Sequence, residues 1–161
     1  MSATPSTADP FTLELQHIRG LIEANQLPQA AQALNAAQKK APKDARLPLL
    51  GMRMAERVGN LENATQAARR ALALAPDWQV AQIELALLLA RQKQGDEAMR
   101  LAMQALANAP RDAQVMVGAI NVALFSERHD QSLAWAEEGV RRFPDNAGIR
   151  LFLARLLVAL D

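Results

Sequence analysis

The stretch LALAPDWQVA, residues 72–81, decides the fold of this chain because close variants of it recur at a fixed distance. LANAPRDAQV occupies residues 106–115, and QKKAPKDARL occupies residues 38–47. Each variant carries an Ala-Pro pair after one amphipathic segment and an aspartate before the next. Helices tend to end before a proline, and aspartate is a favourable helix cap. The stretch therefore marks the boundary between one structural repeat and the next.

Prolines carry this pattern along the chain at intervals of 34 residues, at Pro42, Pro76, Pro110 and Pro144. Small residues occupy two registers, five and twelve residues before each proline. They are Ala37, Ala71, Ala105 and Gly139, and Ala30, Ala64, Ala98 and Ser132. Small side chains let two helices approach closely, and a fixed period of this length indicates stacked repeats.

Within each repeat the sequence predicts a helix, a short turn and a second helix. Gly59 and Gly95 suit the left-handed conformation that ends a helix. The predicted caps of the second helices are Asn60, Asp96 and Asp130, and those that open each following repeat are Asp44, Asp77, Asp112, and Asp145 or Asn146. Pro48 predicts that its helix begins near Leu47.

The composition favours an all-α protein without a catalytic site. Half of the 161 residues are hydrophobic but only 4% are aromatic, so Ala, Leu, Val and Met must build the core. The formal net charge is +1, which gives no electrostatic reason to expect nucleic-acid or membrane-surface binding. There is no cysteine, and His17 and His129 have no metal-ligand spacing. We expect no enzyme activity, no metal and no cofactor.

The ends and hydropathy of the chain give an expectation about its location. MSATPSTADP, residues 1–10, lacks the basic start and apolar core of a secretory signal. No apolar run approaches the roughly 18 residues that span a bilayer. We expect a cytoplasmic protein with residues 1–10 as a flexible tail.

A 34-residue helix–turn–helix with these small residues and a terminal proline resembles the tetratricopeptide repeat. The resemblance covers residues 11–161: four repeats at 11–44, 45–78, 79–112 and 113–146, then a lone helix at 147–160. It implies a right-handed superhelical solenoid of stacked antiparallel helix pairs, with about nine helices. The family's aromatic positions are not kept. They hold residues such as Glu14, Leu21, Pro48 and Ala55, while Trp78 and Trp135 fall elsewhere.

The resemblance also implies a concave groove, lined by the first helix of each repeat, that binds a segment of another protein. The groove register holds Leu15, Leu49, Ile83, Val117 and Leu151, and one turn further it holds Arg19, Arg53, Leu87, Asn121 and Arg155. Aliphatic anchors beside arginines suit an amphipathic or acidic-apolar segment. The alternative is that the aliphatic residues contact neighbouring helices and belong to the core.

The lone helix at 147–160 is apolar around most of its circumference, and a repeat array normally ends on a polar face. Phe152, Leu153, Leu156, Leu157 and Leu160 form the predicted contact surface. Three explanations stay open: the natural chain continues past Asp161, the helix docks against a second copy in a homodimer, or the fold tolerates an apolar end.

These patterns predict a non-catalytic protein-interaction module, an adaptor or scaffold. One alternative is the accessory repeat region of a larger enzyme, since bacterial glycosyltransferases, methyltransferases and sulfotransferases with a similar layout carry such repeats before the catalytic domain. Another is a self-assembly module that associates through residues 147–160.

Overall fold

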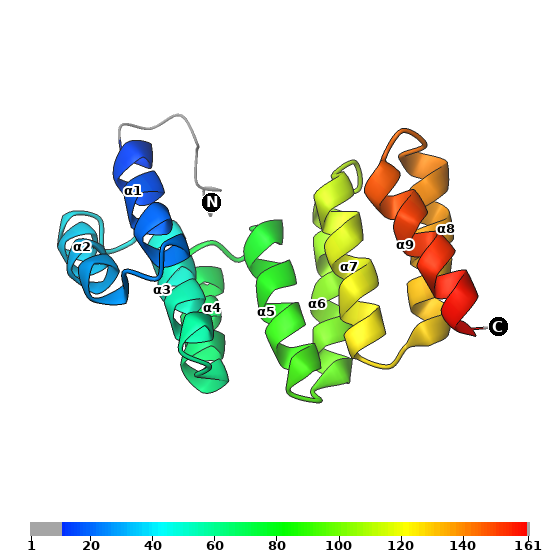
Figure 1. Ribbon diagram of the computed structural model, residues 1–161, viewed down its shortest axis with the longest axis horizontal. Helices are drawn as coiled ribbons and strands as arrows, with labels where there is room; N and C mark the ends of the chain where they lie inside the picture. The colour runs from blue at the N-terminus through cyan, green and yellow to red at the C-terminus, as the bar shows by residue number, and fades with distance from the viewer. Residues whose placement is uncertain (1–10, 161) are drawn as a thin grey trace. The chain divides into compact units, whose positions relative to one another are not determined.

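The computed structural model describes residues 11–160, and every regular element in this range is an α-helix (Figure 1). The prediction of an all-α protein is confirmed, whereas the predicted tail, residues 1–10, lies outside the described residues. The helices are α1 (Thr12–Glu23), α2 (Leu27–Lys40), α3 (Arg46–Arg57), α4 (Leu61–Leu74), α5 (Gln79–Arg91), α6 (Gly95–Asn108), α7 (Ala113–Phe125), α8 (His129–Arg142) and α9 (Ala147–Leu160).

The chain divides into two compact halves, Met1–Ala81 and Gln82–Asp161, each of which we describe by itself. The N-terminal half buries one face of α1 against α2 and α3. Ile18 and Leu47 are almost fully buried, and Ala30 and Ala37 of α2 have no exposed surface. Alanine at these two positions lets α2 lie close to the bulkier side chains of α1.

The C-terminal half repeats this arrangement with α7, α8 and α9. Its core cluster contains Met116, Ile120, Ala136, Ile149 and Leu156. Ser132 occupies the position that is alanine in the other repeats, and its hydroxyl donates to the Ile120 carbonyl oxygen at 3.1 Å. A fully buried hydroxyl is therefore satisfied by the helix that it packs against.

One register ends the first helix of every repeat in the left-handed conformation. The φ angles there are 58° at Asn25, 74° at Gly59, 64° at Lys93 and 60° at Glu127. The prediction for Gly59 is confirmed and that for Gly95 is wrong, because Gly95 is the first residue of α6. Position 93, not 95, lies 34 residues after Gly59, so the repeat register decides the turn even where it places a lysine there.

Side-chain caps start several helices where the sequence predicts them. The Asn60 side chain accepts from the Asn63 N–H at 3.0 Å, and Asp112 accepts from the Gln114 N–H at 2.8 Å. Of the two candidates before α9, Asn146 is the cap, since it accepts from the Ile149 N–H. The predictions for Asp96 and Asp130 are wrong, because both lie within the first turn of their helices. The N-cap positions there belong to Gln94 and Arg128.

Replacing Lys93 with glycine should raise the free energy of unfolding by about 1 kcal/mol, because a left-handed backbone is strained for any residue with a Cβ. The ion pair lost with the lysine has side chains 75% and 70% exposed, so it offsets little of the gain. Urea denaturation measures the change. Lys93→Ala, which keeps the strain and removes the same ion pair, should not stabilise the protein. Equal stabilities of the two variants would contradict the strain argument.

Candidate functional site

In the N-terminal half, the predicted groove register separates into buried and exposed residues. Leu15 and Leu49 are buried, with 8% and 7% of their surface exposed. Arg19 and Arg53, one turn further along α1 and α3, are exposed and line a common hollow of about 340 Å³. Glu23, Glu56, Arg57 and the buried side chain of Ile22 complete its lining. The structure thus brings the two arginines together on a charged face.

In the C-terminal half, exposure along the same register rises toward the end of the chain. Ile83 is 7% exposed and lies against Gly118 of α7. Leu87, Val117 and Asn121 are half-buried, and the Asn121 amide donates to the Val117 carbonyl oxygen at 3.1 Å. Leu151 is 54% exposed and Arg155 is also exposed. A charge placed at Leu15, Leu49 or Ile83 would enter the core, so binding tests must use the exposed members.

The predicted contact surface on α9 is also divided. Leu156 is buried, and Phe152 and Leu153 pack against the core of the C-terminal half. Leu157 and Leu160 remain 47% and 45% exposed. The residues available to a partner on α9 are therefore only part of the predicted set.

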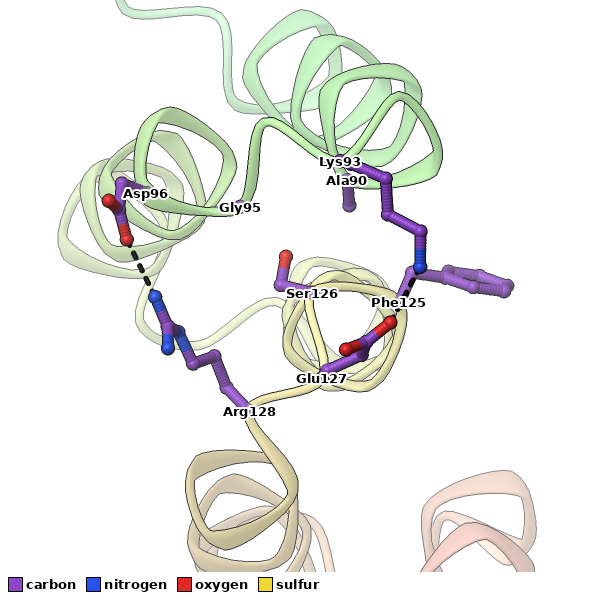
Figure 2. A pocket seen from close by; sticks show the side chains of 8 residues that line it. All are labelled: Ala90, Lys93, Gly95, Asp96, Phe125, Ser126, Glu127 and Arg128. Carbon is purple, nitrogen blue, oxygen red and sulfur yellow. Dashed lines mark hydrogen bonds and ion pairs between the residues drawn. The ribbon is translucent and has the colours of Figure 1, made fainter.

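A second hollow, of about 430 Å³, lies where the α5–α6 and α7–α8 turns meet in the C-terminal half (Figure 2). Lys93 pairs with Glu127, and Arg128 pairs with Asp96, both at 2.6 Å. The hydrogen bond from Lys93 and the charge of its ammonium lower the pKa of Glu127. Sequence reasoning missed this hollow, although Lys93 and Glu127 are 34 residues apart and the period alone places them in consecutive turns.

The chemistry available in this second hollow is limited. The buried Ser126 hydroxyl has no hydrogen-bond partner, so no base is placed to activate it. The two ion pairs connect consecutive turns and are widely exposed, and such pairs stabilise a fold only slightly. The arrangement is that of a link between adjacent repeats.

A third hollow, of about 440 Å³, lies in the N-terminal half and is mainly apolar. It is lined by Gln38, Pro42, Leu47, Pro48, Arg70, Ala73 and Leu74. The ladder proline Pro42 and the early Pro48 both border it. They cannot donate backbone hydrogen bonds, which leaves its rim without N–H groups at two positions.

The most buried ion pair that the structure shows joins Asp44 to Arg46 just before α3. The Arg46 Nη2 atom lies 2.6 Å from the carboxylate, with side chains 16% and 15% exposed. Burial by itself raises the pKa of Asp44, but hydrogen bonds from the Arg46 side chain and backbone N–H, together with its charge, outweigh burial and lower the pKa. The pair therefore holds the start of α3 in place.

Asp44→Asn should lower the free energy of unfolding by about 1 kcal/mol at pH 7, because it removes a charge-assisted interaction. A carboxyl with a lowered pKa in the folded state stabilises the fold above its unfolded pKa, close to 3.8, and loses this effect as the pH falls through the folded value. The difference between the two proteins should therefore shrink below about pH 3.8. Denaturation at several pH values measures it, and a pH-independent difference would contradict the assignment.

Neither a metal site nor a membrane span is found in the described part of the chain. No group of three or more His, Cys, Asp or Glu residues within 11–160 is placed to hold a metal ion. No helix in this range is long and apolar enough to cross a bilayer. His17 and His129 both lie exposed.

Comparison with known proteins rests on structure. No protein-family model matches the sequence, and no curated protein matches it. Among solved structures, a chain from work on Pseudomonas aeruginosa PilF is 20% identical, with 91% of this chain and 67% of that chain covered at a TM-score of 0.76. TTC0263, a tetratricopeptide repeat protein of Thermus thermophilus, is 18% identical, with coverage of 95% and 84% and a TM-score of 0.78.

A chain of the APC/C hetero-tetramer Cut9–Hcn1 is 17% identical, at a TM-score of 0.72, with coverage of 89% of this chain and 29% of that one. The sequence identities are low, but the helical arrangement agrees over most of this chain. The predicted resemblance is thus supported by structure, and the chain has the tetratricopeptide-repeat fold.

Proposed function

We propose that this chain is a non-catalytic protein-binding module whose N-terminal half holds a partner segment on the face with Arg19 and Arg53. The observation that carries the proposal is the shared hollow, which places exposed guanidinium groups from α1 and α3 on one face. The fold supports it, since a chain with similar helical arrangement occurs in the Cut9–Hcn1 hetero-tetramer.

The lining of this hollow indicates the chemistry of the segment. Three arginines and two glutamates surround it, so positive charge is in excess. Arginine binds carboxylates with two parallel hydrogen bonds and so selects for them geometrically. Ile22 adds an apolar contact, although only 2% of its surface is exposed. An acidic segment with a few apolar side chains fits this lining better than a basic or wholly apolar one.

Capture of partners from lysates of the source cells tests the proposal. The wild-type chain is compared with Arg19→Glu/Arg53→Glu by quantitative mass spectrometry of the retained proteins. We expect the double charge reversal to lower recovery of at least one partner by tenfold or more, since it replaces attraction by repulsion. The control is Arg70→Glu/Arg111→Glu, which changes the charge equally at exposed positions elsewhere.

The control variant should retain the partner, and both variants should keep the native circular-dichroism spectrum. Equal recovery by the wild-type chain and Arg19→Glu/Arg53→Glu would overturn the proposed binding face.

A further inference from the structure

The outer face of α9 lies at a register that is covered in every earlier repeat. Ile18, Met52, Ala86 and Ile120 hold this position in the four preceding first helices, and none has exposed surface. The equivalent residue of α9, Ala154, is exposed. One turn further, Val158 is 80% exposed, and Leu157 between them is 47% exposed. The face carries the side chains of a helix–helix interface without the second helix.

In the earlier repeats, the helix that covers this register is the second helix of the same repeat. Ile18 clusters with Ala30, Leu34 and Ala37 of α2. The Ser132 hydroxyl of α8 bonds to the carbonyl oxygen of Ile120, which places α8 directly over this position. Figure 1 shows α9 beside α8, the helix of the preceding repeat, and no second helix follows α9 within residues 11–160. The missing cover thus has the geometry of a second helix.

A polar contact recurs between the two helices of a repeat and fixes their orientation. Glu14 of α1 accepts from Lys40 in the last turn of α2 at 3.0 Å. Gln82 of α5 accepts from Asn108 in the last turn of α6 at 3.3 Å. Arg150 occupies the equivalent position of α9, because it lies two periods after Gln82 and four after Glu14. A helix docked in the same manner would place the end of its last turn beside this guanidinium.

The charge of α9 indicates which helix fits. Residues 147–160 contain Arg150 and Arg155 and no acidic residue. A second copy of α9 would bring arginines against arginines, and the second helices of this chain hold Lys40, Leu74, Asn108 and Arg142 at the matching position. None of these can neutralise Arg150. Charge complementarity therefore favours a helix from a different protein.

We propose that the Ala154–Val158 face of α9 docks an amphipathic helix of another protein, antiparallel to α9. That helix carries small residues seven positions apart, as at Ala30 and Ala37, and an acidic residue three positions after the second of them. The small residues lie over Ala154 and Val158, and the carboxylate pairs with Arg150. This site lies in the C-terminal half and does not depend on the hollow around Arg19 and Arg53.

Two peptides that differ at one position test the proposal. Both are acetylated, fluorescein-labelled copies of residues 60–76, which contain Ala64 and Ala71. One carries Leu74→Glu and the other Leu74→Lys. Short isolated helices are marginally stable, so fluorescence anisotropy is followed to millimolar protein concentration. The wild-type chain should bind the Glu peptide about tenfold more tightly than the Lys peptide, a difference of about 1.4 kcal/mol.

Two protein variants then assign the binding site. Val158→Glu should weaken binding of the Glu peptide by about tenfold or more, since it places a charge in the apolar contact. Leu13→Glu, at a 77% exposed position of α1, is the matched control and should bind as the wild-type chain does. Arg150→Glu should reverse the preference and favour the Lys peptide.

Failure of either peptide to bind, equal binding of both, or binding that Val158→Glu leaves unchanged would overturn the proposal. Light scattering of the chain alone provides the remaining test, and we expect a monomer. A dimer that Val158→Glu dissociates would assign this face to a second copy and would also overturn the proposal.

Discussion

Gly118→Val should lower the free energy of unfolding by about 3 kcal/mol, because α7 has no space for a side chain at this position. A Cβ atom there would lie 2.4 Å from Ile83 Cγ2 and 3.4 Å from Ile83 Cδ1. Both residues are buried, so neither helix can yield without disturbing the core of the C-terminal half. Thermal and urea denaturation measure the loss.

The matched control for this substitution is Gly20→Val in α1. A Cβ atom at Gly20 would have no neighbour within 4 Å, and the residue is exposed. We expect a change below about 1 kcal/mol there, because only helix propensity differs. Ile83→Ala should cost about 2–5 kcal/mol by itself yet recover part of the loss when combined with Gly118→Val. Additive losses would contradict the direct contact between these side chains.

Ile149→Ala should lower the free energy of unfolding by about 3 kcal/mol and release α9 from the C-terminal half. Ile149 has no exposed surface and lies against the other helices of its half. A Cβ atom at Gly139 would be 2.9 Å from Ile149 Cγ2, which shows how closely the isoleucine approaches α8. Because a terminal helix of a repeat array is stabilised by one neighbouring repeat only, the loss should concentrate there.

Hydrogen exchange read by mass spectrometry locates the effect of Ile149→Ala. Amides of α9 should lose protection, while those of α1 to α4 should keep it. Leu151→Ala, two residues away at a position 54% exposed, is the control and should leave α9 protected. Uniform loss of protection along the chain would show that the protein unfolds as one unit and that α9 is not separately released.

The repeat architecture could be predicted because its determinants are local and periodic. The ladder prolines and the small residues at two registers recur every 34 residues, and all eight small positions are buried. The failure at Gly95 shows the limit of residue preference. A glycine favours a left-handed backbone wherever it stands, but the turn is set by the packing of the helices that it joins, and this placed Lys93 in that conformation.

The exposure of the groove register could not be predicted, because it depends on what the following repeat places against it. Leu15, Leu49 and Ile83 share one register with Leu151, yet the first three are buried and the last is 54% exposed. Gly118 of the next repeat packs against Ile83, whereas no repeat follows Leu151 within residues 11–160. The sequence of one helix does not contain this information.

Site-specific photo-cross-linking in the source cells tests the central claim, partner binding on the face of Arg19 and Arg53, most directly. The chain carries p-benzoylphenylalanine in place of Arg53, and a control chain carries it in place of Gln66, an exposed residue of α4. We predict a discrete, heavier, cross-linked band from position 53 that is absent from position 66. No discrete band from position 53, or the same bands from both positions, would contradict the claim that this face binds a partner protein.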